Sequence, residues 1–154
     1  MIATSVETAH RPDRGSRSKS APRTPATIGE APMAIIDPSY ETPDDYAKAA
    51  EAVITANRKW PVGILMLWYP ILGRREGELA SLKDRLFCAD IPGTLCLEMI
   101  VGKSDGEGFG LSGSGLIIVR PPWRLAEEAG SALPWLAAAL AGARAIPPRR
   151  RAQV

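Results

Sequence analysis

The chain has 154 residues, of which 45% are hydrophobic and 23% charged, and its formal net charge is +2. This length suits one domain with a sizeable core, and no apolar run reaches the roughly 18 residues that a membrane-spanning helix needs. Cys88 and Cys96 have neither CxxC spacing nor a nearby histidine, so we expect reduced thiols in a cytoplasmic protein and no metal site. His10 is the single histidine, which excludes a serine–histidine triad from the expected chemistry.

The two ends of the chain differ in composition from its middle. Residues 1–32 are rich in Arg, Ser, Pro and Thr and carry almost no periodic apolar residues, which predicts a disordered basic arm. Residues 142–154 contain Arg149-Arg150-Arg151 and are predicted to form a disordered basic tail. Both ends could contact phosphates, and solvated tails without a ligand are an equally good interpretation. The predicted domain spans residues 33–141.

Within this domain, apolar runs alternate with helical spacings. In chain order the predicted elements are a buried strand over 33–36, a helix capped by Thr42 that ends near residue 60, a buried strand over 63–69 stopped by Pro70, a helix over 74–87, a strand over 94–101, a Gly-rich loop over 102–115, a strand over 116–120, and a helix over 125–140 that Pro134 kinks or restarts. The last two strands lie one loop apart and should pair antiparallel. This order predicts an α/β fold, the second half of a doubly wound sheet.

Two further motifs are less informative than they look. Gly108-x-Gly110-x-x-Gly113 matches a dinucleotide fingerprint, but a strand rather than a helix is predicted after it, so nucleotide binding there is not expected. Pro121-Pro122-Trp123 follows Arg120, whose guanidinium accepts no hydrogen bond, and we interpret it as a structural turn.

The motif that carries chemistry is Asp37-Pro38-Ser39-Tyr40, at the end of the first predicted strand of the domain. Open α/β sheets place their sites at strand ends. An exocyclic amine on a flipped-out base needs a hydrogen-bond acceptor and a flat surface for stacking, and this turn offers Asp37 and Tyr40. The pattern is close to Asp-Pro-Pro-Tyr, the signature of methyltransferases that modify base amino groups, with Ser39 in place of the second proline.

Two residues outside this turn are candidate substrate contacts. Tyr69 ends the next predicted strand and is expected to flank the base pocket, with core positions for Trp68 and Tyr69 as the alternative. Ser112, with Ser114, is expected in the Gly-rich loop near the same edge of the sheet, where it would contact the substrate.

Several separated segments together resemble the C-terminal half of the RlmJ family, bacterial methyltransferases that modify an adenine N6 in large-subunit ribosomal RNA. The segments, in one order, are Ile36-Asp-Pro-Ser-Tyr-Glu41, Asp45-Tyr46, Leu67-Trp-Tyr-Pro70, Leu97-Glu98, Leu111-Ser-Gly-Ser-Gly115, Val119-Arg-Pro-Pro-Trp123 and Leu133-Pro-Trp-Leu136. The resemblance implies a Rossmann-like (class I) fold, S-adenosylmethionine as methyl donor and ribosomal RNA as partner. It also implies that Asp37 accepts from the adenine amine and lies at the cofactor site, that the Pro38 carbonyl accepts from the same amine, and that Tyr40 stacks on the base.

Family members are longer, and the part that precedes the motif, including the Gly-rich loop that holds the cofactor, has no counterpart in residues 1–32. Two functional hypotheses follow. In the first, the chain is an adenine-N6 methyltransferase of ribosomal RNA, either as a homodimer or with the missing N-terminal half supplied by another chain. In the second, it is a non-catalytic remnant of such an enzyme that binds RNA or a protein partner.

Overall fold

The computed structural model describes residues 3–9, 32–89, 91, 93–100 and 110–140. Their helices and strands are, in order, β1 (Ala3–Ala9), β2 (Met33–Ile36), α1 (Asp44–Lys59), β3 (Ile64–Leu72), the short 3-10 helix η1 (Gly73–Arg75), α2 (Glu76–Cys88), β4 (Thr94–Ile100), β5 (Leu111–Val119) and α3 (Leu125–Leu140). The predicted α/β class is confirmed, and the predicted elements of the domain all appear. No helix in this described part is long and apolar enough to cross a membrane.

The strands form one sheet in the order β1-β4-β5-β3-β2. β2 pairs parallel with β3, and the pairs β3–β5, β5–β4 and β4–β1 are antiparallel. The predicted antiparallel pairing of the last two strands is confirmed by β4 and β5. Because β2 and β3 are parallel, their carboxyl ends lie at the same end of the sheet, where Asp37 follows β2.

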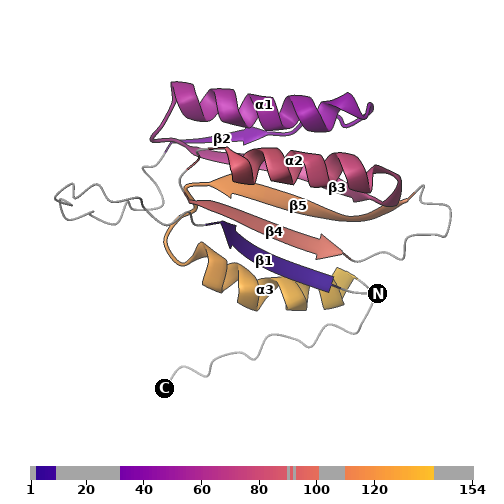
Figure 1. Ribbon diagram of the computed structural model, residues 1–154. Coiled ribbons are helices and arrows are strands. Elements are labelled where there is room, and N and C mark those ends of the chain that lie inside the picture. Colours follow the sequence, from indigo (N-terminus) through magenta and orange to yellow (C-terminus); the bar gives the residue numbers. More distant parts are fainter. Residues whose placement is uncertain (1–2, 10–31, 90, 92, 101–109, 141–154) are drawn as a thin grey trace, which may run out of the picture.

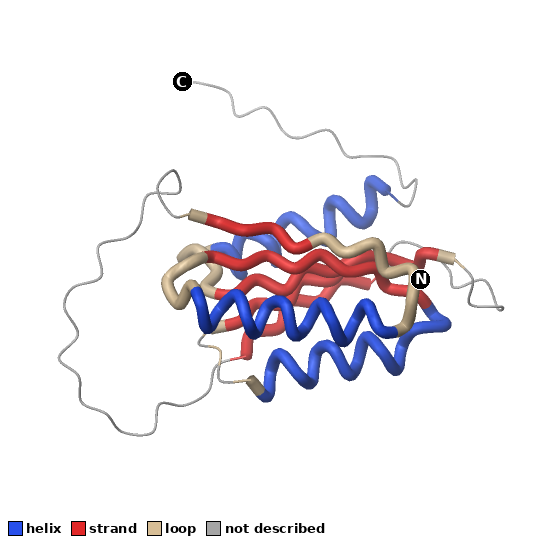
Figure 2. The backbone as a smooth tube through the Cα atoms, turned by 90° about the horizontal axis from the view of Figure 1, so that it is seen from above, coloured by secondary structure: helices blue, strands red, loops and turns tan. Residues whose placement is uncertain are grey.

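Helices cover both faces of the sheet, as Figures 1 and 2 show. α1 and α2 pack together on one face, where a core forms from α1, α2, β3, β5 and β4; its largest fully buried side chains include Tyr46, Tyr69, Leu65, Leu67, Leu82, Leu86 and Ile117. α3 packs on the other face, mainly against β1 and β4, over a smaller core of Leu95, Leu97 and Ile118. α3 continues through Pro134 as one helix.

The start of α1 is stabilised differently from the prediction. Thr42 was expected to cap the helix with its hydroxyl, but its backbone N–H donates to the Asp45 carboxylate at 2.8 Å, and the Asp45 N–H donates to the Thr42 carbonyl at 3.2 Å. The bond from the Thr42 backbone N–H, with weaker contributions from the Thr42 side chain and Lys48, lowers the pKa of Asp45. The carboxylate thus takes over the capping role, because it accepts the N–H that would otherwise lack a partner at the helix start.

The predicted disordered arm is wrong for Ala3–Ala9. This segment forms β1 and pairs with β4 along its whole length, from Ala3 opposite Ile100 to Ala9 opposite Thr94. The stretch is too short to show a clear pattern by itself, and the free edge of β4 supplies the hydrogen bonds that order it. The remainder of the arm, residues 10–31, and the predicted tail lie outside the described residues.

Three strand predictions also need correction. β2 was expected to be buried, but it is an edge strand with Met33 and Ile35 exposed. β3 does not stop at Pro70: it runs to Leu72, and proline is tolerated because the pairing with β2 ends at Leu67 and leaves that side of β3 as an edge. β5 begins at Leu111, so the second half of the predicted loop is strand.

Candidate functional site

The Asp37 turn lies at the carboxyl ends of the two parallel strands. The last β2–β3 pair is Ile36 opposite Leu67, and Asp37 follows directly with an exposed side chain. Pro38 is half-buried and Ser39 exposed, and α1 begins a few residues later. The predicted position of Asp37 at the end of a strand is confirmed, and the structure adds that this residue is exposed to solvent.

Tyr40 ties this turn to β3. Its backbone is left-handed, with φ of 54°, and its side chain is only 5% exposed. The hydroxyl donates to the Trp68 carbonyl at 2.7 Å, and in the first turn of α1 the Tyr46 hydroxyl donates to the Pro70 carbonyl at 3.2 Å. Both carbonyls lie on β3 beyond its last pair with β2, so the two phenols satisfy acceptors that the strand pairing leaves open.

The packing of the Tyr40 ring differs from the predicted role. The ring centroid lies 4.8 Å from that of Tyr46 in a tilted arrangement and 6.1 Å from that of Trp68 in an edge arrangement, so the ring packs among other aromatic side chains. Burial, with smaller effects of Tyr46 and the carboxylates of Asp37 and Asp45, raises the pKa of Tyr40. Tyr40 is thus a neutral hydrogen-bond donor within the core, and stacking on a base would require its ring to leave this packing.

Tyr69 does not line an open surface, so the expectation that it flanks a base pocket is wrong and the alternative core position is correct. Its side chain is fully buried, and its hydroxyl donates to Glu98 Oε1 at 2.8 Å and lies 3.2 Å from Cys96 Sγ. Lys83 Nζ lies 2.6 Å from the same Glu98 oxygen. Burial is the largest cause that raises the pKa of both Tyr69 and Cys96. This cluster joins β3, β4 and α2, and its role is structural.

Ser112 lies on β5 rather than in a loop, because the strand starts at Leu111. It is 7% exposed, and among the described residues its Oγ has no hydrogen-bond partner. Ser114, the other serine of the segment, pairs with Pro70 on β3 and Met99 on β4. Both serines thus lie at the same end of the sheet as Asp37, although Ser112 is buried. Gly113 also lies in β5, so the glycine motif is followed by a strand as predicted; Gly108 lies outside the described residues.

The sequence analysis missed two basic residues at the end of the sheet where Asp37 lies. Arg74 and Arg75 form η1 directly after β3, at the carboxyl end of that strand. Arg75 is partly buried and forms an ion pair with Glu78 at 3.0 Å. A hydrogen bond from the backbone N–H of Glu78, followed by this contact with Arg75, lowers the pKa of Glu78. The signal was available, because an Arg-Arg pair soon after a strand at the same edge as Asp37 places positive charge close to the candidate site.

Arg120 has a structural role at the other end of the sheet, away from Asp37. Arg120, with φ of 54°, donates from its guanidinium to Asn57 Oδ1 at 2.9 Å and to the Gly63 carbonyl at 3.3 Å, which agrees with the predicted structural turn.

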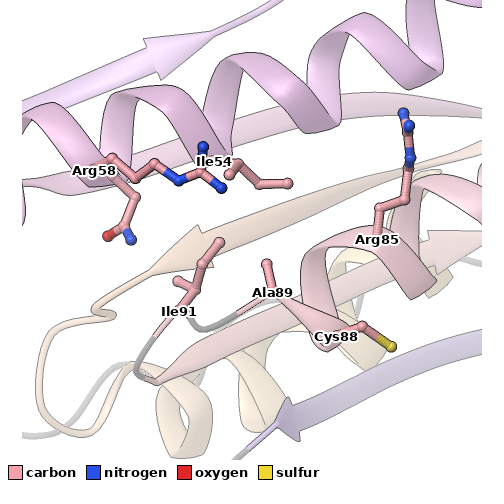
Figure 3. A pocket seen from close by; sticks show the side chains of 7 residues that line it. Ile54, Arg58, Arg85, Cys88, Ala89 and Ile91 are labelled. Atoms are coloured by element: carbon pink, nitrogen blue, oxygen red, sulfur yellow. The ribbon is translucent and has the colours of Figure 1, made fainter.

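A cavity of about 340 Å³ lies between the C-terminal ends of α1 and α2; Figure 3 shows its lining residues Ile54, Asn57, Arg58, Arg85, Cys88, Ala89 and Ile91. This cavity does not include Asp37. The described residues contain no cluster of side chains that could hold a metal ion.

Comparison with known proteins identifies the family. Residues 16–147 match the family model described as "Ribosomal RNA large subunit methyltransferase D, RlmJ". The chain belongs to the RlmJ family. Among its relatives, "Ribosomal RNA large subunit methyltransferase J" of Escherichia coli is 31% identical over 104 residues and that of Haemophilus influenzae 29%, in each case over 68% of this chain and 36% of the relative.

A solved structure supports the fold. Protein LPL1258 of Legionella pneumophila matches with a TM-score of 0.61 and 23% identity, over 71% of this chain and 39% of that protein. The family model and the two curated relatives confirm the predicted resemblance to the RlmJ family. The chain spans little more than a third of the length of the relatives that it matches.

Proposed function

We propose that this chain takes part in methylation of an adenine N6 in large-subunit ribosomal RNA, with S-adenosylmethionine as methyl donor and a Rossmann-like domain as scaffold. The observation that carries the proposal is the exposed Asp37 on a rigid turn at the carboxyl end of a parallel strand, in a chain of the RlmJ family. The relatives are named as ribosomal RNA large subunit methyltransferases, and this names the substrate class. We expect the protein to act in the cytoplasm, where such RNA is assembled.

In this mechanism Asp37 and Pro38 orient the adenine amine. The Asp37 carboxylate accepts one amine hydrogen and the Pro38 carbonyl the other, which leaves the nitrogen lone pair directed at the methyl group. An adenine amine is too weak an acid for a carboxylate to ionise in the ground state, so Asp37 orients the nucleophile and takes its proton only as the new N–C bond forms. S-adenosylmethionine, when bound, would supply an electrophilic methyl group, whose bond to the sulfonium sulfur breaks as the N–C bond forms, with S-adenosylhomocysteine as the leaving group.

Tyr40 acts as a positioning residue in this proposal. Its hydrogen bond to Trp68 and its contact with Tyr46 hold the turn in a left-handed conformation that a bulky residue rarely adopts. Ser39 follows Pro38 without the second proline of the signature, so the turn depends more strongly on Tyr40 for its rigidity.

The described residues fit one part of a cofactor site. Asp37 offers an exposed carboxylate beside the free edge of β2, which suits a polar contact to the cofactor. The described part of the chain shows no glycine-rich turn between a strand and a helix N-terminus, the arrangement that would hold the other polar groups of such a cofactor. We therefore assign Asp37 alone to cofactor contact.

The test is methyl transfer from labelled S-adenosylmethionine to unmodified large-subunit ribosomal RNA. We expect Asp37→Ala to lower the rate by about 100-fold or more, in the range measured for loss of one preorganised polar group. The matched control is Asp44→Ala, which removes an exposed carboxylate from the nearby first turn of α1. Transfer that is insensitive to Asp37, or equally sensitive to Asp44, would refute the assignment.

A further inference from the structure

One edge of the sheet is left open by β2. In the described structure β2 pairs only with β3, through Met33–Ile36 opposite Ile64–Leu67. The strand contains no charged residue, no proline and no bulge, the features with which natural sheets protect an edge from pairing. This edge therefore has the character of a pairing surface.

The face of β2 turned away from α1 is apolar and exposed. Ala34 and Ile36 pack against the core on the α1 side, so Met33 and Ile35 point to the opposite face, where they are 52% and 63% exposed. Met66, next to Ile35 on β3, lies on this second face and is only partly buried. α3 packs mainly on β1 and β4, at the other side of the sheet, so this surface lacks a covering helix layer among the described residues.

The parallel pairing of β2 and β3 is a second indication that another element covers this exposed surface. Sheets made only of parallel strands are almost always covered on both faces, because the helices that connect such strands lie over them. β2 and β3 are the parallel pair of the described sheet, and they are the part whose second face is exposed. Among the described residues, Ala3–Ala9 does not cover it, because this segment forms β1 at the opposite edge, as Figure 1 shows.

The comparisons indicate the occupant. The matched segment makes up 36% of each curated relative and 39% of the solved one, so more than half of each relative lies outside it. We propose that the β2 edge, with Met33, Ile35 and Met66, is an interface for a polypeptide that carries this remaining part of an RlmJ-type domain. That polypeptide adds a strand along β2 and lays an apolar helix over the exposed face. The inference rests on the proposed function only for the partner's fold and requires no catalysis.

The experiment co-expresses the tagged full chain with a probe, the part of the Escherichia coli relative that lies outside its matched segment. Capture on the tag and sedimentation velocity should show a 1:1 complex. We expect Ile35→Lys to weaken this complex at least about tenfold, since a lysine at the centre of an apolar interface places a charge where it loses water. Met33→Glu is a second variant at the same surface, and both positions are exposed, so folding of the chain is preserved.

The matched control is Val6→Lys, which adds the same charge at a 40% exposed position on β1, at the opposite edge. This variant should bind the probe like the native chain. Absence of a complex, or equal weakening by Val6→Lys, overturns the proposal. A homodimer of the chain alone that Ile35→Lys dissociates also overturns it, because the occupant is then a second copy. A complex that forms without methyl transfer supports the interface and counts against the proposed function.

Discussion

Replacement of Gly115 by alanine tests the buried cluster around Tyr69. A Cβ at this position of β5 would overlap Cζ and the hydroxyl oxygen of Tyr69, far inside van der Waals contact. The ring has little room to retreat, because it is fully buried and its hydroxyl is held by Glu98 at 2.8 Å. Tyr69 can therefore occupy its buried position only because residue 115 has no side chain.

The expected change in the free energy of unfolding follows from three contributions. Overpacking of a core costs about 1–3 kcal/mol. Displacement of the Tyr69 hydroxyl from the Glu98 carboxylate costs roughly 1.5–3 kcal/mol, the range for bonds to a charged group. Alanine in place of glycine recovers about 0.5–1 kcal/mol of backbone entropy. We therefore expect Gly115→Ala to destabilise the protein by about 2–5 kcal/mol.

Urea unfolding followed by tryptophan fluorescence measures this change. The control is Gly130→Ala in α3, where no atom lies within 4 Å of the added Cβ, and it should stabilise by up to about 1 kcal/mol. In a Tyr69→Leu background, the cost of Gly115→Ala should fall, because the ring atoms that it meets are gone. A stabilising effect of Gly115→Ala, or an equal cost in both backgrounds, would refute the reasoning.

Three further predictions concern stability. Asn57→Ala removes the 2.9 Å acceptor of the partly buried Arg120 guanidinium and should cost about 1–3 kcal/mol in urea unfolding. Arg124→Ala breaks an exposed ion pair and should change the same quantity by less than about 1 kcal/mol. Burial raises the pKa of Tyr40 and Tyr69 above the ordinary value of 10.0, so the unfolded chain ionises first. The contribution of these two tyrosines to stability should be constant below about pH 9 and fall as pH rises above 10, by about 1.4 kcal/mol per pH unit for each tyrosine, and Tyr69→Phe should make that fall less steep.

Local patterns predicted most elements of the domain, because their sequences carry the necessary signals. The apolar run from Thr94 predicted a strand within one residue of β4, and the spacing of α3 predicted its bounds at 125–140. β1 was missed, since Ala3–Ala9 is ordered by pairing with β4, more than 80 residues away in the chain. The exposure of β2 was missed for a related reason: an apolar run shows that a strand is favourable, but its neighbours decide whether it is central or at an edge.

The candidate site was predictable in position but not in detail. Asp37 follows an apolar run and precedes a proline, and these local facts place it at a strand end. The burial of Tyr40 depends on its left-handed φ and on contacts with α1 and β3, which no spacing in the sequence encodes. For Tyr69, a shift of one residue along β3 decides which face its side chain takes. The cluster with Glu98 forms on the α2 face, across three elements of the sheet and its covering helix.

The Asp37 turn is held by hydrogen bonds on the β3 side, and on its other side it borders the unpaired edge of β2. Towards β3, Tyr40 and Tyr46 fix the Asp37 turn through hydrogen bonds to the backbone of that strand. Towards the free edge, the same turn continues from β2, whose residues Met33 and Ile35 remain exposed. A substitution on the edge should therefore affect methyl transfer only through assembly, and excess probe should restore the rate. Loss of the Asp37 carboxylate should not be restored by any concentration of probe, because that group acts on the amine itself. The response to added probe thus separates a defect of the interface from a defect of the chemistry.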